Sequence, residues 1–161
     1  MTTTESSRST GPTFGPRKPR LNHVAMSLSP DLLDDAHRRL LVDFYSYVFG
    51  FDELPMLTED RHRLVLQVHN IEQFLFLIAE DEPMRCPRLD HWGVSVGEES
   101  ELDDILARAE AWRARDDRVE IIDKKVEDHG VLAITSIYVR YLLPMMLEVQ
   151  WWDYKRDGQQ A

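Results

Sequence analysis

The chain has 161 residues, 43% of them apolar, which is the size and composition of one folded domain. Its 19 basic and 29 acidic residues give a formal net charge of −10. A protein this acidic is repelled by phosphate backbones and by anionic lipid. We therefore expect neither nucleic acid nor a membrane among its partners.

No apolar run approaches the roughly 18 residues that span a bilayer, and the opening MTTTESSRST lacks the basic and apolar regions of a signal peptide. We therefore expect a soluble, cytoplasmic protein. The single cysteine, Cys86, excludes an internal disulfide and a thiolate metal cluster. Any bound metal must accordingly be held by histidine and carboxylate side chains.

Residues 1–20 differ from the rest in composition. They contain three prolines, two glycines and many Ser and Thr, with Phe14 as the large apolar residue after the initial Met. Such a segment buries too little apolar surface to offset the entropy of ordering. We predict a disordered tail over 1–20, followed by a single domain over 21–161.

An internal repeat divides this domain. LNHVAMSLS begins at residue 21 and LDHWGVSVG begins at residue 89, which is an offset of 68. With one residue inserted, Leu33-Asp34-Asp35 aligns with Leu102-Asp103-Asp104. The repeat predicts two similar modules, at about 21–80 and 89–154.

Each module begins with an alternating stretch typical of a strand and continues with an amphipathic helix, which Gly50 ends in the first module. Three strand-like runs follow in each: 53–58, 64–68 and 74–79, then 119–126, 133–140 and 145–151. The predicted fold is α+β, with two βαβββ modules forming a cupped mixed sheet whose helices lie on the outer face.

Strand parity separates the two faces of this sheet. In the first strand of each module the apolar positions suit packing on a helix, whereas His23 and His91 point the other way. In the last strand Glu148 and Gln150 likewise oppose the apolar positions. Small and polar residues on the face away from the helices favour a sheet curved around a cavity.

These residues, with the run FYSYVFGF at 44–51, resemble the vicinal oxygen chelate superfamily. That superfamily includes glyoxalase I, extradiol dioxygenases, fosfomycin-resistance enzymes and bleomycin-resistance proteins. The resemblance covers about residues 21–154. It implies a cup built from both modules, with a divalent metal held by His23, His91 and Glu148.

The chemistry of this residue set agrees with the resemblance. Two neutral imidazoles and one carboxylate leave coordination positions open, so that a metal can bind two neighbouring substrate oxygens. Iron(II) is the first expectation, with manganese or zinc as alternatives. An isolated histidine on a strand is more often an ordinary core or surface residue. The equivalent positions of His23 and His91 in the repeat favour the metal interpretation.

Two departures from the family bear on the reaction. Glyoxalase I and methylmalonyl-CoA epimerase carry a fourth ligand on the last strand of the first module, but the run FLFLIA at 74–79 contains none. Glu80 has the offset of 68 from Glu148 and lies at the strand end. No equivalent is evident of the polar and basic loop with which fosfomycin-resistance enzymes bind potassium and a phosphonate.

Extradiol dioxygenases match one further detail, because in that family a His and a Tyr precede the metal-binding Glu. Here His129 lies nine residues before Tyr138, which lies ten before Glu148. The pair predicts catalytic residues, with Tyr138 orienting a substrate oxygen and His129 moving a proton. Alternatively, Tyr138 is a cross-strand aromatic and His129 a turn residue. The family's Asp-Pro turn is replaced here by RYLLP at 140–144.

The function predicted from these features is a metal-dependent enzyme of this superfamily that acts on a small molecule with two neighbouring oxygens. Its most specific form is an extradiol-type dioxygenase. One alternative is a metal-free ligand-sequestering protein resembling bleomycin-resistance proteins. A glyoxalase-like lyase or isomerase is another. A homodimer is expected, because small members of the superfamily often pair and sometimes build each site from both chains.

Overall fold

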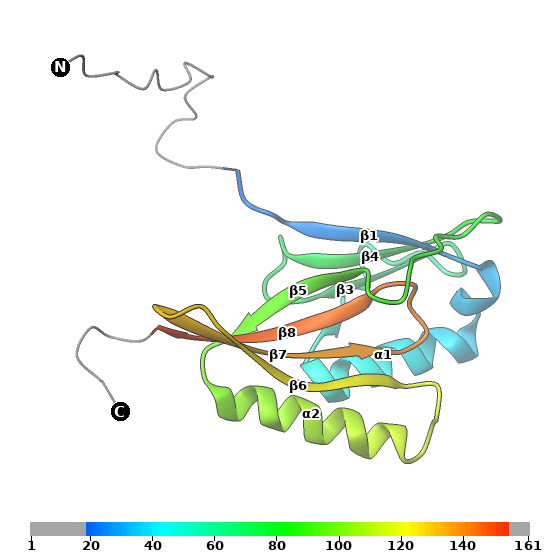
Figure 1. Ribbon diagram of the computed structural model, residues 1–161. Coiled ribbons are helices and arrows are strands. Elements are labelled where there is room, and N and C mark those ends of the chain that lie inside the picture. Colours follow the sequence, from blue (N-terminus) through cyan, green and yellow to red (C-terminus); the bar gives the residue numbers. More distant parts are fainter. Residues whose placement is uncertain (1–18, 155–161) are drawn as a thin grey trace.

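A computed structural model describes residues 19–154 of the chain (Figure 1). The predicted disordered tail therefore lies almost wholly outside the described residues. The elements in chain order are β1 (His23–Leu28), a 3-10 turn (Pro30–Leu33), α1 (Asp35–Phe49), β2 (Asp52–Glu53), β3 (Arg63–Gln67), β4 (Phe74–Ala79), β5 (His91–Val96), α2 (Glu99–Arg113), β6 (Glu120–Asp128), β7 (Leu132–Arg140) and β8 (Met146–Tyr154).

The prediction of two βαβββ modules is confirmed. The first module forms a four-stranded sheet in the order β1-β4-β3-β2, and the second forms one in the order β5-β8-β7-β6. In each sheet the first strand pairs parallel with the last, and the remaining pairs are antiparallel. The first strand of each module is consequently an edge strand of its own sheet.

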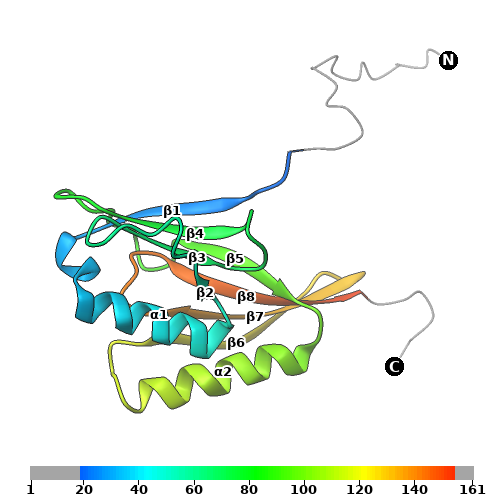
Figure 2. The same cartoon turned by 180° about the vertical axis from the view of Figure 1, so that it is seen from behind.

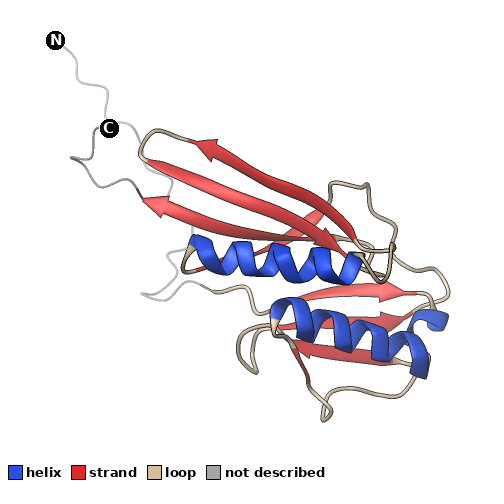
Figure 3. Cartoon of the chain, turned by 90° about the horizontal axis from the view of Figure 1, so that it is seen from below, coloured by secondary structure: helices blue, strands red, loops and turns tan. Residues whose placement is uncertain are grey.

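Both helices cover the same side of the strands, as the views from behind and from below show (Figures 2 and 3). The alternation along β1 follows from this arrangement, because Met26 and Leu28 are buried while His23 is exposed. The opposite face of both sheets is left without a helix, and that face carries the predicted site residues His23, His91, Tyr138 and Glu148.

The two modules are joined by aromatic packing between α1 and the second module. The buried ring of Phe44 lies 5.5 Å from the ring of Trp112 on α2 and 4.5 Å from that of Tyr141 after β7. The Tyr45 hydroxyl donates to the Tyr141 carbonyl at 3.1 Å. Arg108 Nε of α2 donates to the Val48 carbonyl at 3.0 Å. The two modules therefore share one hydrophobic core.

The predicted strand over 53–58 is wrong beyond its first residue. β2 ends at Glu53, and the chain turns over 55–57. Pro55 has no backbone N–H to donate to a ladder, which favours the turn. Leu54 N donates to the Val65 carbonyl at 2.9 Å, and the Thr58 hydroxyl accepts from Val65 N at 3.2 Å.

The alignment of Leu33-Asp34-Asp35 with Leu102-Asp103-Asp104 is also wrong in structural terms. Leu33 lies in the 3-10 turn, whereas Leu102 lies inside α2. Asp34 is the N-cap of α1, and its carboxylate accepts from the backbone N–H groups of Ala36 and His37. The 3-10 turn adds residues between the first strand and the helix of the first module. The starts of α1 and α2 are therefore separated by fewer residues than the starts of β1 and β5.

Among the described residues, no helix has both the length and the apolar character needed to cross a lipid bilayer.

Candidate metal centre

Three of the four predicted residues of the second module, His91, Tyr138 and Glu148, meet on the face of its sheet that has no helix. Gly93 of β5 and Tyr138 of β7 are both direct register partners of Glu148 of β8. Directly opposed residues on neighbouring strands point to the same face. The three positions therefore form one row across the sheet. His91 lies two residues before Gly93 on β5, so it is on the same face.

Glu148 is nearly buried, with 7% of its surface exposed. Its two carboxylate oxygens have different neighbours. The Tyr138 hydroxyl donates to Oε1 at 2.6 Å. The other oxygen, Oε2, lies 3.4 Å from Nε2 of His91. The carboxylate is thus fixed at one oxygen by a phenol and turned at the other toward an imidazole.

The orientation of His91 is set by the chain before β5. Its Nδ1 lies 2.8 Å from the Leu89 carbonyl oxygen, which can only accept, so Nδ1 carries the proton and donates. In the neutral ring Nε2 then presents a lone pair to Oε2 of Glu148. Two acceptors facing each other are stabilised by a cation bound between them. These two atoms are suitable ligands for a divalent metal. Metal-binding histidines commonly donate the N–H of their other ring nitrogen to a backbone carbonyl, as His91 does to Leu89.

Tyr138 contacts both members of this pair. Besides its bond to Glu148, its ring lies edge-on to the His91 ring at 5.2 Å, with an interplanar angle of 82°. Burial, and then the hydrogen bond to Glu148, raise the pKa of Tyr138 above its usual value. The hydroxyl consequently keeps its proton at neutral pH and acts as a donor.

His23 lies apart from this pair. Its exposed ring stacks on Phe74 at 5.1 Å with an interplanar angle of 5°, and its Nδ1 lies 2.9 Å from Asn22 Oδ1. His23, Phe74 and Gly93 line one small pocket of about 80 Å³ between β1 and β5. Within residues 19–154, no three His, Cys, Asp or Glu side chains gather closely enough to hold a metal. The structure therefore joins His91 and Glu148 and leaves His23 outside their contact.

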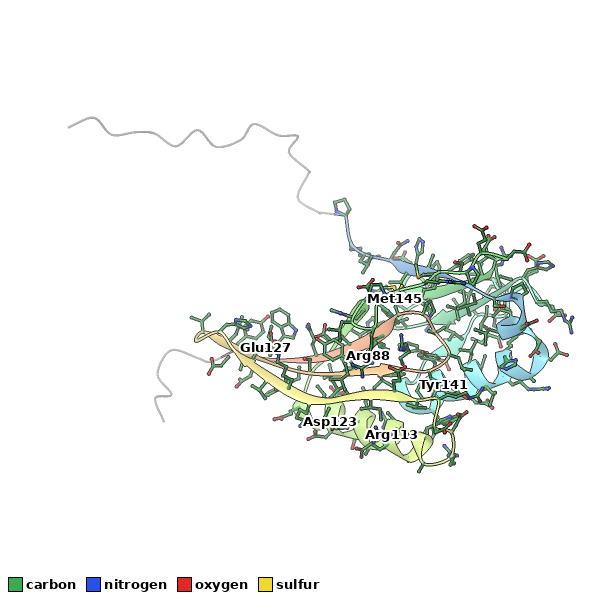
Figure 4. The ribbon with its side chains drawn as sticks, turned by 45° about the vertical axis from the view of Figure 1, so that its right-hand side comes forward. Arg88, Arg113, Asp123, Glu127, Tyr141 and Met145 are labelled. Atoms are coloured by element: carbon green, nitrogen blue, oxygen red, sulfur yellow. The ribbon has the colours of Figure 1, made fainter. Side chains whose placement is uncertain are left out.

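His129 is also distant from the pair. It lies in the turn between β6 and β7, its side chain is 53% exposed, and its Nε2 is 4.0 Å from Oε2 of Glu127. Figure 4 labels Glu127, beside His129 in this hairpin, and Arg88, which lies shortly before His91 in the chain. Glu127 is near the projecting end of the hairpin and Arg88 is over the body of the protein, well separated from it. Tyr138, by contrast, is in direct contact with Glu148.

The position in the first module that corresponds to Glu148 is Phe76. It pairs with Ala25 on one side and Val65 on the other, as Glu148 pairs with Gly93 and Tyr138. Glu80 follows the end of β4 and is not the equivalent of Glu148. The first module therefore repeats the histidine of the second but has neither its carboxylate nor its phenol.

Two features of the site were not recognised in the sequence. One is the Leu89 carbonyl that orients His91, and because it is a backbone group no sequence pattern marks it. The other is Gly93, where an added Cβ would lie 3.6 Å from Oε2 of Glu148. A glycine inside a strand often marks a place where another group comes close to the backbone. Gly93 was therefore the sequence feature that could have indicated the nearby carboxylate.

No protein-family model and no curated protein matches this sequence. Solved structures do match its fold. A lactoylglutathione lyase from Agrobacterium tumefaciens is 16% identical, with a TM-score of 0.56 over 83% of this chain and 94% of that one. The fosfomycin resistance protein FosX from Listeria monocytogenes is 14% identical, with a TM-score of 0.56 over 84% and 94%.

A third match is a glyoxalase/bleomycin resistance protein from Albidiferax ferrireducens T118. It is 12% identical, with a TM-score of 0.57 over 81% of this chain and 98% of that one. At these identities the likeness establishes the fold, and the chemistry of this chain has to be argued from its own residues.

Proposed function

We propose that this chain, which has the fold of the vicinal oxygen chelate superfamily, is a metal-dependent enzyme acting on a small substrate with two neighbouring oxygens. The observation that carries the proposal is the pair formed by His91 Nε2 and Glu148 Oε2, 3.4 Å apart. With His91 neutral and its proton on Nδ1, the two facing atoms are both acceptors, and the other atom of each side chain is held by a hydrogen bond.

The roles of the residues follow from this geometry. His91, Glu148 and His23 are the proposed metal ligands, with iron(II) as the first choice and manganese or zinc as alternatives. A divalent metal bound there stabilises negative charge that develops on the substrate oxygens. The Leu89 carbonyl orients His91, and Gly93 leaves space beside the carboxylate.

The first experiment measures the metal content of the purified protein by elemental analysis after incubation with iron(II), Mn²⁺ or Zn²⁺ and removal of free ion. Wild type is expected to retain about one ion per site, whereas His91→Ala and Glu148→Gln lose it. His62→Ala is the matched control, because His62 is an exposed turn residue. Metal retention unaffected by His91→Ala would contradict the site.

His23 is the third proposed ligand, supplied either within the chain or by a second copy in a homodimer. Dimers that combine one His23→Ala chain with one His91→Ala chain distinguish the two. A site shared between chains leaves one complete site per mixed dimer, and a site within one chain leaves none. Light scattering at micromolar concentration should give the mass of two chains, and the mass of one chain would contradict the homodimer.

Ring cleavage of a catechol is the specific reaction we propose to test first. Phe76 at the position corresponding to Glu148 supports it over glyoxalase chemistry, which uses a further ligand on that strand. A catechol panel with iron(II) under air should give the yellow ring-opened product. His129→Ala tests the predicted proton transfer, and turnover equal to wild type would contradict that role.

Absence of product with metal bound would remove ring cleavage and leave a lyase or isomerase reaction. Ligand binding that is indifferent to a chelator would instead identify a metal-free sequestering protein.

A further inference from the structure

The phenol of Tyr138 and the carboxylate of Glu148 occur together in one module and are missing together from the other. The modules share their strand pairing, so the first provides an internal comparison. It keeps the histidine at His23 but has Phe76 and Val65 where the second has Glu148 and Tyr138. The phenol thus accompanies the carboxylate and not the histidine.

The contact between them is directional. The Tyr138 hydroxyl donates to Oε1 at 2.6 Å, while the other oxygen, Oε2, faces His91 Nε2. Glu148 is nearly buried, so its carboxylate has little water to compete with this bond. A short hydrogen bond to a charged acceptor in such a place is strong and fixes the orientation of the carboxylate plane.

We infer that Tyr138 is a positioning residue for the metal site, not a group that orients a substrate oxygen. Its hydroxyl holds Oε1 and so leaves Oε2 alone to bind the metal. A carboxylate that binds through one oxygen occupies one coordination position, which leaves more positions for two substrate oxygens. This inference rests on the proposed function, because Tyr138 acts on the metal only through its hydrogen bond to Glu148, a proposed metal ligand.

The test is the variant Tyr138→Phe, which removes the hydroxyl and keeps the ring against His91. Binding of Mn²⁺ alone, followed by the electron paramagnetic resonance signal of the free ion, is expected to weaken about 10- to 100-fold. Thermal unfolding of the metal-free variant checks that it is folded. Tyr154→Phe is the matched control, because Tyr154 lies on β8 with 68% of its surface exposed. It should bind Mn²⁺ like wild type.

The possible results separate this inference from the proposed function. A folded Tyr138→Phe that binds Mn²⁺ as wild type does, with only its turnover reduced, overturns the positioning role and leaves the metal site intact. Wild type that binds no metal overturns the proposed function and the inference with it. In the Co²⁺-substituted protein, a visible absorption spectrum that differs between wild type and Tyr138→Phe supports a change in carboxylate coordination. Identical spectra contradict it.

Discussion

Asp34 shows how a single polar side chain fixes where an element begins. Its carboxylate accepts from the backbone N–H groups of Ala36 at 3.0 Å and His37 at 2.8 Å. These bonds to the charged form, with the bond to His37 as the largest contribution, lower the pKa of Asp34. The N–H groups of the first helical turn lack partners within the helix, so the cap stabilises α1 directly.

Replacing Asp34 by Ala should lower the free energy of unfolding, since it leaves two N–H groups of the first helical turn to water. Urea denaturation measures this loss. Asp34→Ser, which restores a capping oxygen, should recover most of it. Equal stability of the Ala and Ser variants would show that the cap is not what stabilises the start of α1.

Helix α1 belongs to the first module by sequence, yet its buried face also packs on the second. Phe44 contacts the rings of Trp112 and Tyr141, and Tyr45 donates to the Tyr141 carbonyl. The position of the second sheet relative to the first therefore depends on this helix. The proposed site depends on it in turn, because His23 and Gly93 line a pocket between the two sheets.

Phe44→Ala should destabilise the protein by about 3–5 kcal/mol, because it leaves a cavity in the core shared by both modules. Tyr47→Ala on the same helix is the control and should cost much less, because Tyr47 is 47% exposed. Denaturation curves provide the comparison. A Phe44→Ala loss no larger than that of Tyr47→Ala would mean that the modules are held together elsewhere.

The whole molecule carries two buried tyrosines at the junction of its modules. Burial, and then the bond to Asp116, raise the pKa of Tyr141 to about 12, and burial also raises the pKa of Tyr45. In the unfolded chain tyrosine loses its proton near pH 10. Between about pH 10 and 12 the unfolded state therefore binds fewer protons than the folded one, so stability falls as pH rises.

The expected result is a free energy of unfolding that is steady between neutral pH and about pH 10 and decreases steeply from about pH 10 to 12. Tyr141→Phe should have a shallower decrease over this window, whereas Tyr154→Phe should keep the wild-type slope because Tyr154 is exposed. Urea denaturation at a series of pH values measures the slopes. A Tyr141→Phe slope equal to that of wild type would exclude this tyrosine as a source of alkaline instability.

The sequence by itself determined the module order and the face of the strands on which the two first-strand histidines and Glu148 lie. These depend on local periodicity, because a residue two positions along a strand returns to the same face. The same reasoning failed at β2 and at the start of α1. There a proline and a 3-10 turn changed the number of residues between elements. A single offset between the two repeats does not show such a local change.

Only the tertiary structure decided which predicted residues meet. It joins Tyr138, Glu148 and His91 through strand pairing, and it separates His129, which lies in the turn of the same hairpin as Tyr138. It also makes Phe76 the counterpart of Glu148. Pairing register and the Leu89 carbonyl bond arise from contacts between segments distant in sequence or from backbone groups. Neither leaves a pattern in side-chain identities, and together they determine how Glu148 and His91 face each other.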